Sequence, residues 1–204
     1  HKVTAMQAVA FNSATSALHA SCLALGLQPG DLAWTTSITF LASANCARYC
    51  NAQVDFVDID IETGLIDIDM LAEKLKNAGA IGRLPNVLIV VHLAGSSCAM
   101  EPIHRLSIQY GFKIIEDASH AIGGKYMDQY VGSCQFSDIT VFSFHPVKII
   151  TTGEGGMALT NSSSLADSLR QVREHGIVRD SSYFKYTYQG SWAYEQHSLG
   201  FNID

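Results

Sequence analysis

Two side chains in this sequence have the chemistry needed to work on a pyridoxal 5'-phosphate cofactor. Lys148 comes shortly after the apolar stretch Val141 to Phe144, and Asp117 closely follows another apolar run, Phe112 to Ile115. An amine can form a Schiff base with the cofactor aldehyde, and a carboxylate can hold the pyridine nitrogen protonated. An amine at one strand end and a carboxylate at another therefore predict an enzyme that uses this cofactor.

The residues around Lys148 are apolar: Pro146, Val147, Ile149 and Ile150. If they surround the amine, they disfavour its charged form and lower its pKa, as a Schiff-base lysine requires. The alternative is a lysine whose stem lies along an apolar edge while its amine reaches water.

Asp117 lies where a parallel strand is expected to end, which is the usual place for ligands in open α/β sheets. A carboxylate that caps a helix is the alternative explanation. His120, three residues later, could contact the same ligand from the same side, or it could be a structural histidine with its hydrogen bonds satisfied.

The segment 12–18 opens a predicted helix with small and hydroxylic residues. The exposed N–H groups and the dipole at such a helix start favour an anion, and Thr15 or Ser16 could add a hydroxyl donor. Ordinary N-capping by Ser13 or Thr15 explains the same pattern. The sequence pattern is consistent with a phosphate-binding site and with an ordinary helix cap.

Three further features could belong to the same site. Ser143 could donate to a phosphate, or it could belong to an ordinary polar strand face. Phe40, at a predicted strand-to-helix junction, could stack on a planar cofactor, although an aromatic residue at such a place more often belongs to the core. The glycines of segment 151–156 predict a turn, and turn geometry explains them better than phosphate binding does.

The elements that must position these residues alternate along the chain. Continuously apolar runs predict buried strands, and segments with helical spacing lie between them. The predicted strands are Val54 to Ile59, Val87 to Leu93, Phe112 to Ile115 and Ile139 to Phe144. The predicted helices are Ala14 to Leu25, Phe40 to Asn51, Asp67 to Asn77, Pro102 to Tyr110 and Ser163 to His175. The alternation predicts an α/β domain with a largely parallel sheet covered by helices.

The composition is that of a globular protein. The 204 residues are 48% hydrophobic and only 16% charged, which argues against disorder. A net charge of −6, with no run of Lys and Arg, argues against a nucleic-acid partner. No apolar stretch is long enough to span a bilayer, and residues 1–4 do not begin a signal peptide, so we expect a cytoplasmic protein without a membrane partner.

Five cysteines, with no CxxC pair, predict buried free thiols in a reducing compartment and no metal site. The chain stops inside what looks like an ordered motif, Leu199 to Asp204, and the residues before it lack clear periodicity. We therefore expect one domain, residues 1–204, of a longer protein.

Together, six short segments resemble the DegT-type nucleotide-sugar aminotransferases, which are fold-type I pyridoxal phosphate enzymes. Each segment is short, but their shared order is specific. Their residue ranges are 12–18, 91–95, 116–121, 143–148, 152–156 and 173–177. The form Ser-Phe-His-Pro-Val-Lys at 143–148 is most similar to the branch that aminates UDP-linked 4-keto-6-deoxy-hexosamines in the pseudaminic acid pathway.

The resemblance implies a role for each matching residue. Lys148 would hold the cofactor aldehyde and Asp117 would pair with the pyridine nitrogen. Phe40 would cover the ring, and His120 would lie near the phenolic oxygen, at a position where family members often have Gln. The residues expected at the phosphate are Ala14, Thr15, Ser143 and, from the neighbouring subunit of a homodimer, Asn202.

The resemblance also implies the fold and the reaction. The expected fold is the large domain, three layers with a mostly parallel seven-stranded sheet, without the family's N-terminal segment and small C-terminal domain. The expected reaction is transfer of an amino group from an amino acid donor, glutamate, to a nucleotide-linked keto sugar in surface polysaccharide or glycan biosynthesis. One alternative is a sugar dehydratase on the same scaffold, although those enzymes have histidine where Lys148 stands. The other is a nucleotide-binding module without chemistry, although its glycine-rich fingerprints are absent.

Overall fold

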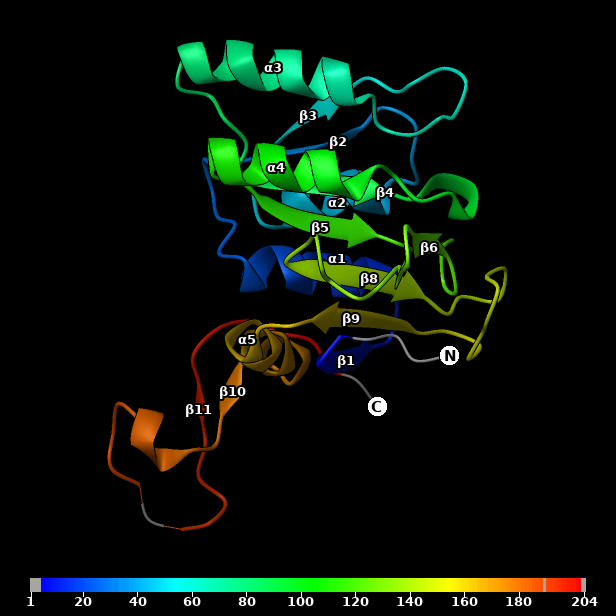
Figure 1. Cartoon of the computed structure of the whole chain (residues 1–204). Coiled ribbons are helices and arrows are strands. Elements are labelled where there is room, and N and C mark those ends of the chain that lie inside the picture. Colours follow the sequence, from blue (N-terminus) through cyan, green and yellow to red (C-terminus); the bar gives the residue numbers. More distant parts are fainter. Residues whose placement is uncertain (1–4, 189, 203–204) are drawn as a thin grey trace.

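The computed structural model describes residues 5–188 and 190–202 (Figure 1). The segment 1–4, on which the expectation about signal peptides rests, and the last two residues of the terminal motif lie outside the described residues. Seven strands form the main sheet: β1 (Gln7–Phe11), β2 (Leu32–Thr36), β3 (Gln53–Val57), β4 (Val87–Val91), β5 (Lys113–Asp117), β8 (Ile139–Ser143) and β9 (Gly156–Thr160).

The strands of this sheet follow the order β1-β9-β8-β5-β4-β2-β3. The pairs β3–β2, β2–β4, β4–β5 and β5–β8 are parallel, and β9 runs antiparallel to both β8 and β1. The expectation of a mostly parallel, seven-stranded sheet is confirmed. The strands predicted from apolar runs did not include β1, β2 or β9, which are short and begin or end with glutamine, threonine or glycine.

Helices cover both faces of the sheet and make three layers (Figure 1). The helices α1 (Ala14–Ala24), α2 (Ala42–Tyr49) and α5 (Ser163–Arg173) share one hydrophobic core with one face. The helices α3 (Ile68–Ala80) and α4 (Met100–Tyr110) pack on the opposite face in a second core. Among the described residues, no helix combines the length and hydrophobicity needed to cross a membrane.

The strand β4 shows why continuous apolar runs mark central strands. All five of its residues are buried. Val87 and Ile89 belong to the core beneath α1 and α2, whereas Leu88 and Val90 belong to the core beneath α3 and α4. Because successive side chains point to opposite faces, a strand covered on both sides needs apolar residues at every position.

The helix boundaries follow from local hydrogen bonds. Ser13 caps α1, because its side chain accepts the N–H of Ser16, so Thr15 is not the cap. The predicted helix over 40–51 is shorter in the structure, since Phe40 and Leu41 precede it and Asn51 has a left-handed φ of 58°. All five cysteines are buried, as predicted.

The segment after α5 contains structure that its lack of periodicity did not predict. The short strands β10 (Ile177–Val178) and β11 (Glu195–Gln196) pair antiparallel, and the chain between them includes the 3-10 turn η2 (Ser181–Tyr183). In Figure 1 this excursion extends away from the sheet. Glu195 in β11 holds this excursion together, because its carboxylate accepts the backbone N–H groups of Lys185 and Tyr186 at 2.9 Å.

Candidate active site

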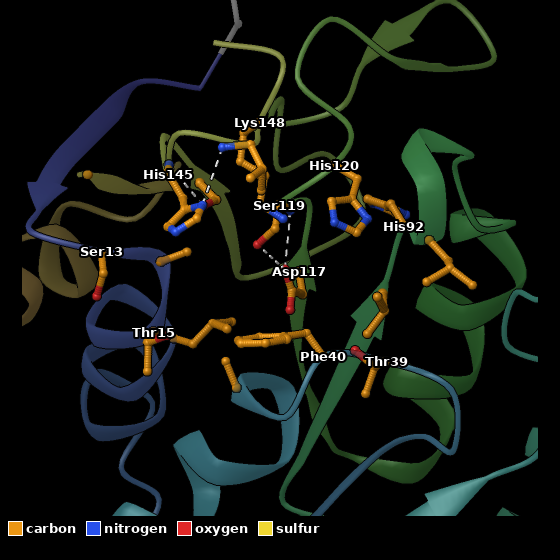
Figure 2. Close-up of a pocket in the computed structure, with 18 of the residues that line it drawn as sticks. Ser13, Thr15, Thr39, Phe40, His92, Asp117, Ser119, His120, His145 and Lys148 are labelled. Carbon is orange, nitrogen blue, oxygen red and sulfur yellow. Dashed lines mark hydrogen bonds between the residues drawn. The ribbon is translucent and has the colours of Figure 1, made fainter. Parts of the chain in front are cut away.

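The carboxyl ends of β2, β4, β5 and β8 meet at one edge of the sheet, because these strands are parallel. The first residues of α1 and of the antiparallel strand β9 lie at the same edge. Together they enclose a cavity of about 370 Å³ (Figure 2), within the size range of small-molecule sites. The residues that line it are Ser13, Ala14, Thr15, Leu18, Thr39, Phe40, Ala42, Val91, His92, Leu93, Asp117, Ser119, His120, Ser143, His145, Val147, Lys148, Glu154 and Gly155.

The start of α1 forms one wall. Since Ser13 provides the cap, the hydroxyl of Thr15 is not used for capping, and the first N–H groups of a helix have no intrahelical partner. Gly156, at the beginning of β9, lies against this turn: a Cβ there would be 2.3 Å from the carbonyl carbon of Ser13 and 2.5 Å from the nitrogen of Ala14. The glycine-rich segment 151–156 therefore does more than turn the chain, because it lets β9 approach the start of α1.

Asp117 is the last residue of β5 and is buried. Its Oδ1 accepts the hydroxyl of Ser119 at 2.6 Å and the N–H of Ser119 at 3.2 Å, and its Oδ2 accepts the hydroxyl of Ser43 at 2.7 Å. Residues 118–121 form a turn and not a helix, so the helix-capping explanation of Asp117 is wrong. Figure 2 shows the Asp117 side chain in the cavity, close to Ser119.

The neighbouring carboxylate, Glu116, points to the opposite face of β5. It accepts a hydrogen bond of 2.7 Å from Nε2 of the buried His92, whose Nδ1 accepts the N–H of Cys98. Burial alone would raise the pKa of Glu116, but the hydrogen bond from His92, together with those from Ser137 and Thr140, outweighs burial and lowers that pKa. Of the two adjacent carboxylates, Glu116 therefore belongs to the packing of the sheet and Asp117 to the cavity.

Lys148 lies on the loop between β8 and β9 and lines the cavity (Figure 2). Its side chain is half-buried, but its apolar neighbours are not packed around it: Val147 is 78% exposed, Ile149 67% and Ile150 53%. The prediction that these residues bury the amine is wrong, because the loop lies at the surface. What brings Lys148 to the cavity is the position of its loop at the carboxyl edge of the sheet.

His120 lies across the cavity from the start of α1 (Figure 2). Its Nδ1 accepts the backbone N–H of Ala94 at 3.3 Å, which requires that nitrogen to be unprotonated. Burial lowers the pKa of His120, the charge of Lys148 lowers it further, and Asp117 acts in the opposite direction. The imidazole is therefore neutral at pH 7.

Phe40 and Ser143 complete the walls. Phe40 is 72% exposed although it is a large aromatic residue, so the core explanation for it is wrong. It lies between β2 and α2 and faces the cavity (Figure 2). Ser143, the last residue of β8, is buried, and its Oγ accepts the N–H of His145 at 3.4 Å.

The structure brings seven of the eight predicted site residues to this cavity; they are Ala14, Thr15, Phe40, Asp117, His120, Ser143 and Lys148. Asn202 is exposed and lies outside it. Sequence patterns missed Ser43 and Ser119, which hold the Asp117 carboxylate. The Asp-x-Ser spacing of Asp117 and Ser119 is a usable local signal, but nothing local marks Ser43.

The family model of the DegT/DnrJ/EryC1/StrS aminotransferases matches residues 1–203. A UDP-4-amino-4,6-dideoxy-N-acetyl-beta-L-altrosamine transaminase of Campylobacter jejuni is 38% identical over 195 residues, which are 96% of this chain and 48% of that protein.

Two solved structures have the same fold. Helicobacter pylori PseC, an aminotransferase of pseudoaminic acid biosynthesis, has a TM-score of 0.81 at 30% identity and covers 98% of this chain. NtdA of Bacillus subtilis, with bound cofactor PMP, has a TM-score of 0.78 at 28% identity and also covers 98% of this chain. The chain spans 49% of the first and 41% of the second, and about half the length of the curated relatives it matches.

Proposed function

Because the chain belongs to the DegT/DnrJ/EryC1/StrS aminotransferase family, we propose that the full-length protein is a transaminase dependent on pyridoxal phosphate. Its acceptor is a keto group on a nucleotide-linked sugar, and its donor is an amino acid, glutamate. The observation that carries this proposal is the single cavity lined by the Lys148 amine, the Asp117 carboxylate and the start of α1.

The donor set of this cavity fits pyridoxal phosphate. The start of α1, with Ala14 and Thr15, offers N–H groups and a hydroxyl to a phosphate, and Ser143 adds a second hydroxyl nearby. Asp117 is the carboxylate for the ring nitrogen, and the exposed ring of Phe40 is available to cover the cofactor. Because Nδ1 of His120 accepts the N–H of Ala94, the neutral imidazole carries its proton on Nε2 and can donate one hydrogen bond near the phenolic oxygen.

Each of these residues has a distinct task in the proposed reaction. Bound in this cavity, the cofactor would supply an electron sink for the carbon that loses its proton. The Nζ of Lys148 would hold the cofactor aldehyde and would move the proton at the donor Cα. The carboxylate of Asp117 keeps the proton on the ring nitrogen. Phe40 fixes the plane of the ring.

The substrate and assembly are also proposals. The similarity to a UDP-linked altrosamine transaminase and to PseC supports a UDP-linked 4-keto-6-deoxy-hexosamine as acceptor. We propose a cytoplasmic homodimer in which Asn202 contacts the phosphate site of the neighbouring subunit. The dehydratase alternative is weaker, because it requires histidine in place of Lys148.

The test uses the full-length protein purified with pyridoxal phosphate. We expect a yellow absorbance band, and after borohydride reduction peptide mass spectrometry should find the cofactor on Lys148. Lys148→Ala should lack the band. Lys76→Ala is the matched control, because Lys76 is exposed on α3 and outside the cavity. A band that persists in Lys148→Ala, or a cofactor attached to another lysine, would contradict the assignment.

A second measurement separates the transaminase from the alternatives. The full-length protein is incubated with glutamate and candidate UDP-linked or other nucleotide-linked keto sugars, and the products are identified by mass spectrometry. An amino sugar together with 2-oxoglutarate supports the proposal. A deoxygenated sugar would favour the dehydratase, and nucleotide binding without cofactor binding would favour the module.

A further inference from the structure

The Asp117 carboxylate is held from both sides by residues with no assigned role. Ser119 donates its hydroxyl and its N–H to Oδ1, at 2.6 and 3.2 Å, and Ser43 donates its hydroxyl to Oδ2 at 2.7 Å. Three donors on two oxygens leave the carboxylate little freedom to rotate. The direction in which its remaining lone pairs point is therefore set by these two serines.

Ser43 is itself part of a longer chain of hydrogen bonds. It lies in the first turn of α2 with no exposed surface, and its Oγ is 2.8 Å from the Oγ1 of Thr39. Because the single hydroxyl proton of Ser43 is donated to Asp117, Thr39 must be the donor of that second bond. The bonds thus run in one direction, from Thr39 to Ser43 and on to Asp117.

The same turn carries the aromatic side chain of the cavity. The N–H of Ser43 donates to the carbonyl of Phe40 at 3.2 Å. Ser43 therefore connects two groups that stand 77 positions apart in the sequence: Phe40, between β2 and α2, and Asp117, at the end of β5. A change at Ser43 alters the position of one relative to the other.

We propose that Ser43, with Ser119, is a positioning residue that aims the Asp117 carboxylate at the ring nitrogen of the cofactor and fixes its distance from Phe40. This inference rests on the proposed function. Its physical basis is preorganisation: a carboxylate locked by hydrogen bonds does not have to be ordered when the cofactor binds. Neither serine takes part in proton transfer, since both act through Asp117.

The test compares full-length variants by pyridoxal phosphate titration followed by absorbance and fluorescence. Ser43→Ala and Ser119→Ala each remove one hydrogen bond to a charged group, and we expect the dissociation constant to rise about tenfold in each. If Asp117 is misdirected, the ring nitrogen of the cofactor loses its proton more easily. An uncharged ring no longer disfavours a proton on the nitrogen of Lys148, so the pH midpoint of the cofactor absorbance band should move upward.

Two variants control for structure. Ser107→Ala removes a buried hydroxyl that donates to the His104 carbonyl in α4, outside the cavity, and should change neither quantity. Ser119→Thr keeps the hydroxyl at a half-buried position and should restore both. If Ser43→Ala does not fold, Ser119→Ala and Ser119→Thr decide the matter.

The outcomes separate this inference from the proposed function. A wild-type protein that binds no pyridoxal phosphate would overturn both. A wild-type protein that binds it, with the two alanine variants behaving like Ser107→Ala, would overturn the positioning role alone. A loss of thermal stability without any shift in the pH midpoint would also overturn it, because a merely structural serine gives that result.

Discussion

The close approach of Gly156 to the start of α1 gives a sharp stability prediction. A Cβ added at Gly156 would lie 2.3 to 2.5 Å from three backbone atoms of Ser13 and Ala14, whereas non-bonded carbon atoms rest about 3.5 to 4.0 Å apart. Relieving this contact requires β9 and the start of α1 to separate by about 1 Å. Because backbone atoms cannot rotate away, we expect Gly156→Ala to lower the free energy of unfolding by about 3 kcal/mol.

Gly79→Ala is the matched control. Neither glycine has a left-handed φ, so the two substitutions differ in the space available. At Gly79, inside α3, the nearest atoms to an added Cβ belong to the side chains of Tyr110 and Leu84, at 3.8 and 3.9 Å. Alanine should therefore be accommodated there and stabilise the helix by about 0.5 to 1 kcal/mol.

The assay is urea unfolding of the full-length protein followed by circular dichroism, together with pyridoxal phosphate titration. Gly156→Ala should unfold at lower urea and bind the cofactor more weakly, because the displaced turn is the proposed phosphate site. Gly79→Ala should leave cofactor binding unchanged. If Gly156→Ala is as stable as Gly79→Ala, the close approach of β9 to α1 does not hold the site together and the reasoning is refuted.

Two further predictions concern titration. Since the charge of Lys148 contributes to lowering the pKa of His120, Lys148→Ala should raise that pKa, and NMR titration of the histidine ring without cofactor would measure it; an unchanged value would contradict their proximity. Glu195 has a lowered pKa in the fold because Lys185 and Tyr186 donate their N–H groups to it. Its contribution to stability is therefore present above the unfolded pKa and is lost as the pH falls through the folded one. The protection factors of the Lys185 and Tyr186 amides, that is, their exchange rates relative to the intrinsic rates at each pH, should decrease over that fall, and they should no longer depend on pH in this range in Glu195→Gln.

The sheet could be predicted wherever burial on both sides dictates the composition. The run Val87 to Val91 has no polar residue, and the structure buries all of it. Strand β9 escaped prediction because it begins at Gly156, whose role is set by the distant turn at Ser13. Short strands of mixed composition receive their structure from neighbours that local periodicity does not reveal.

The site shows the same division. Lys148 and Asp117 are recognisable because each follows an apolar run, and the topology brings the ends of β5 and β8 to one edge. The expected burial of Lys148 was wrong because apolar composition indicates burial only where another element covers the segment. Ser43 could not be predicted, since its hydrogen bond to Asp117 spans 74 positions and its own sequence context is that of any small helix residue.

The arrangement also separates two parts of the proposed chemistry. The proposed cofactor contacts of this chain, from Ala14 to Lys148, lie at one edge of one sheet. The parallel strands and the start of α1 fix that edge, so cofactor binding depends on the topology of this domain. In the proposed reaction, selection of the sugar would depend on the loops around the cavity. Substitutions at the sheet edge should therefore weaken cofactor binding and lower the transamination rate with every acceptor alike. A variant that lowers the rate with one acceptor alone would contradict this division.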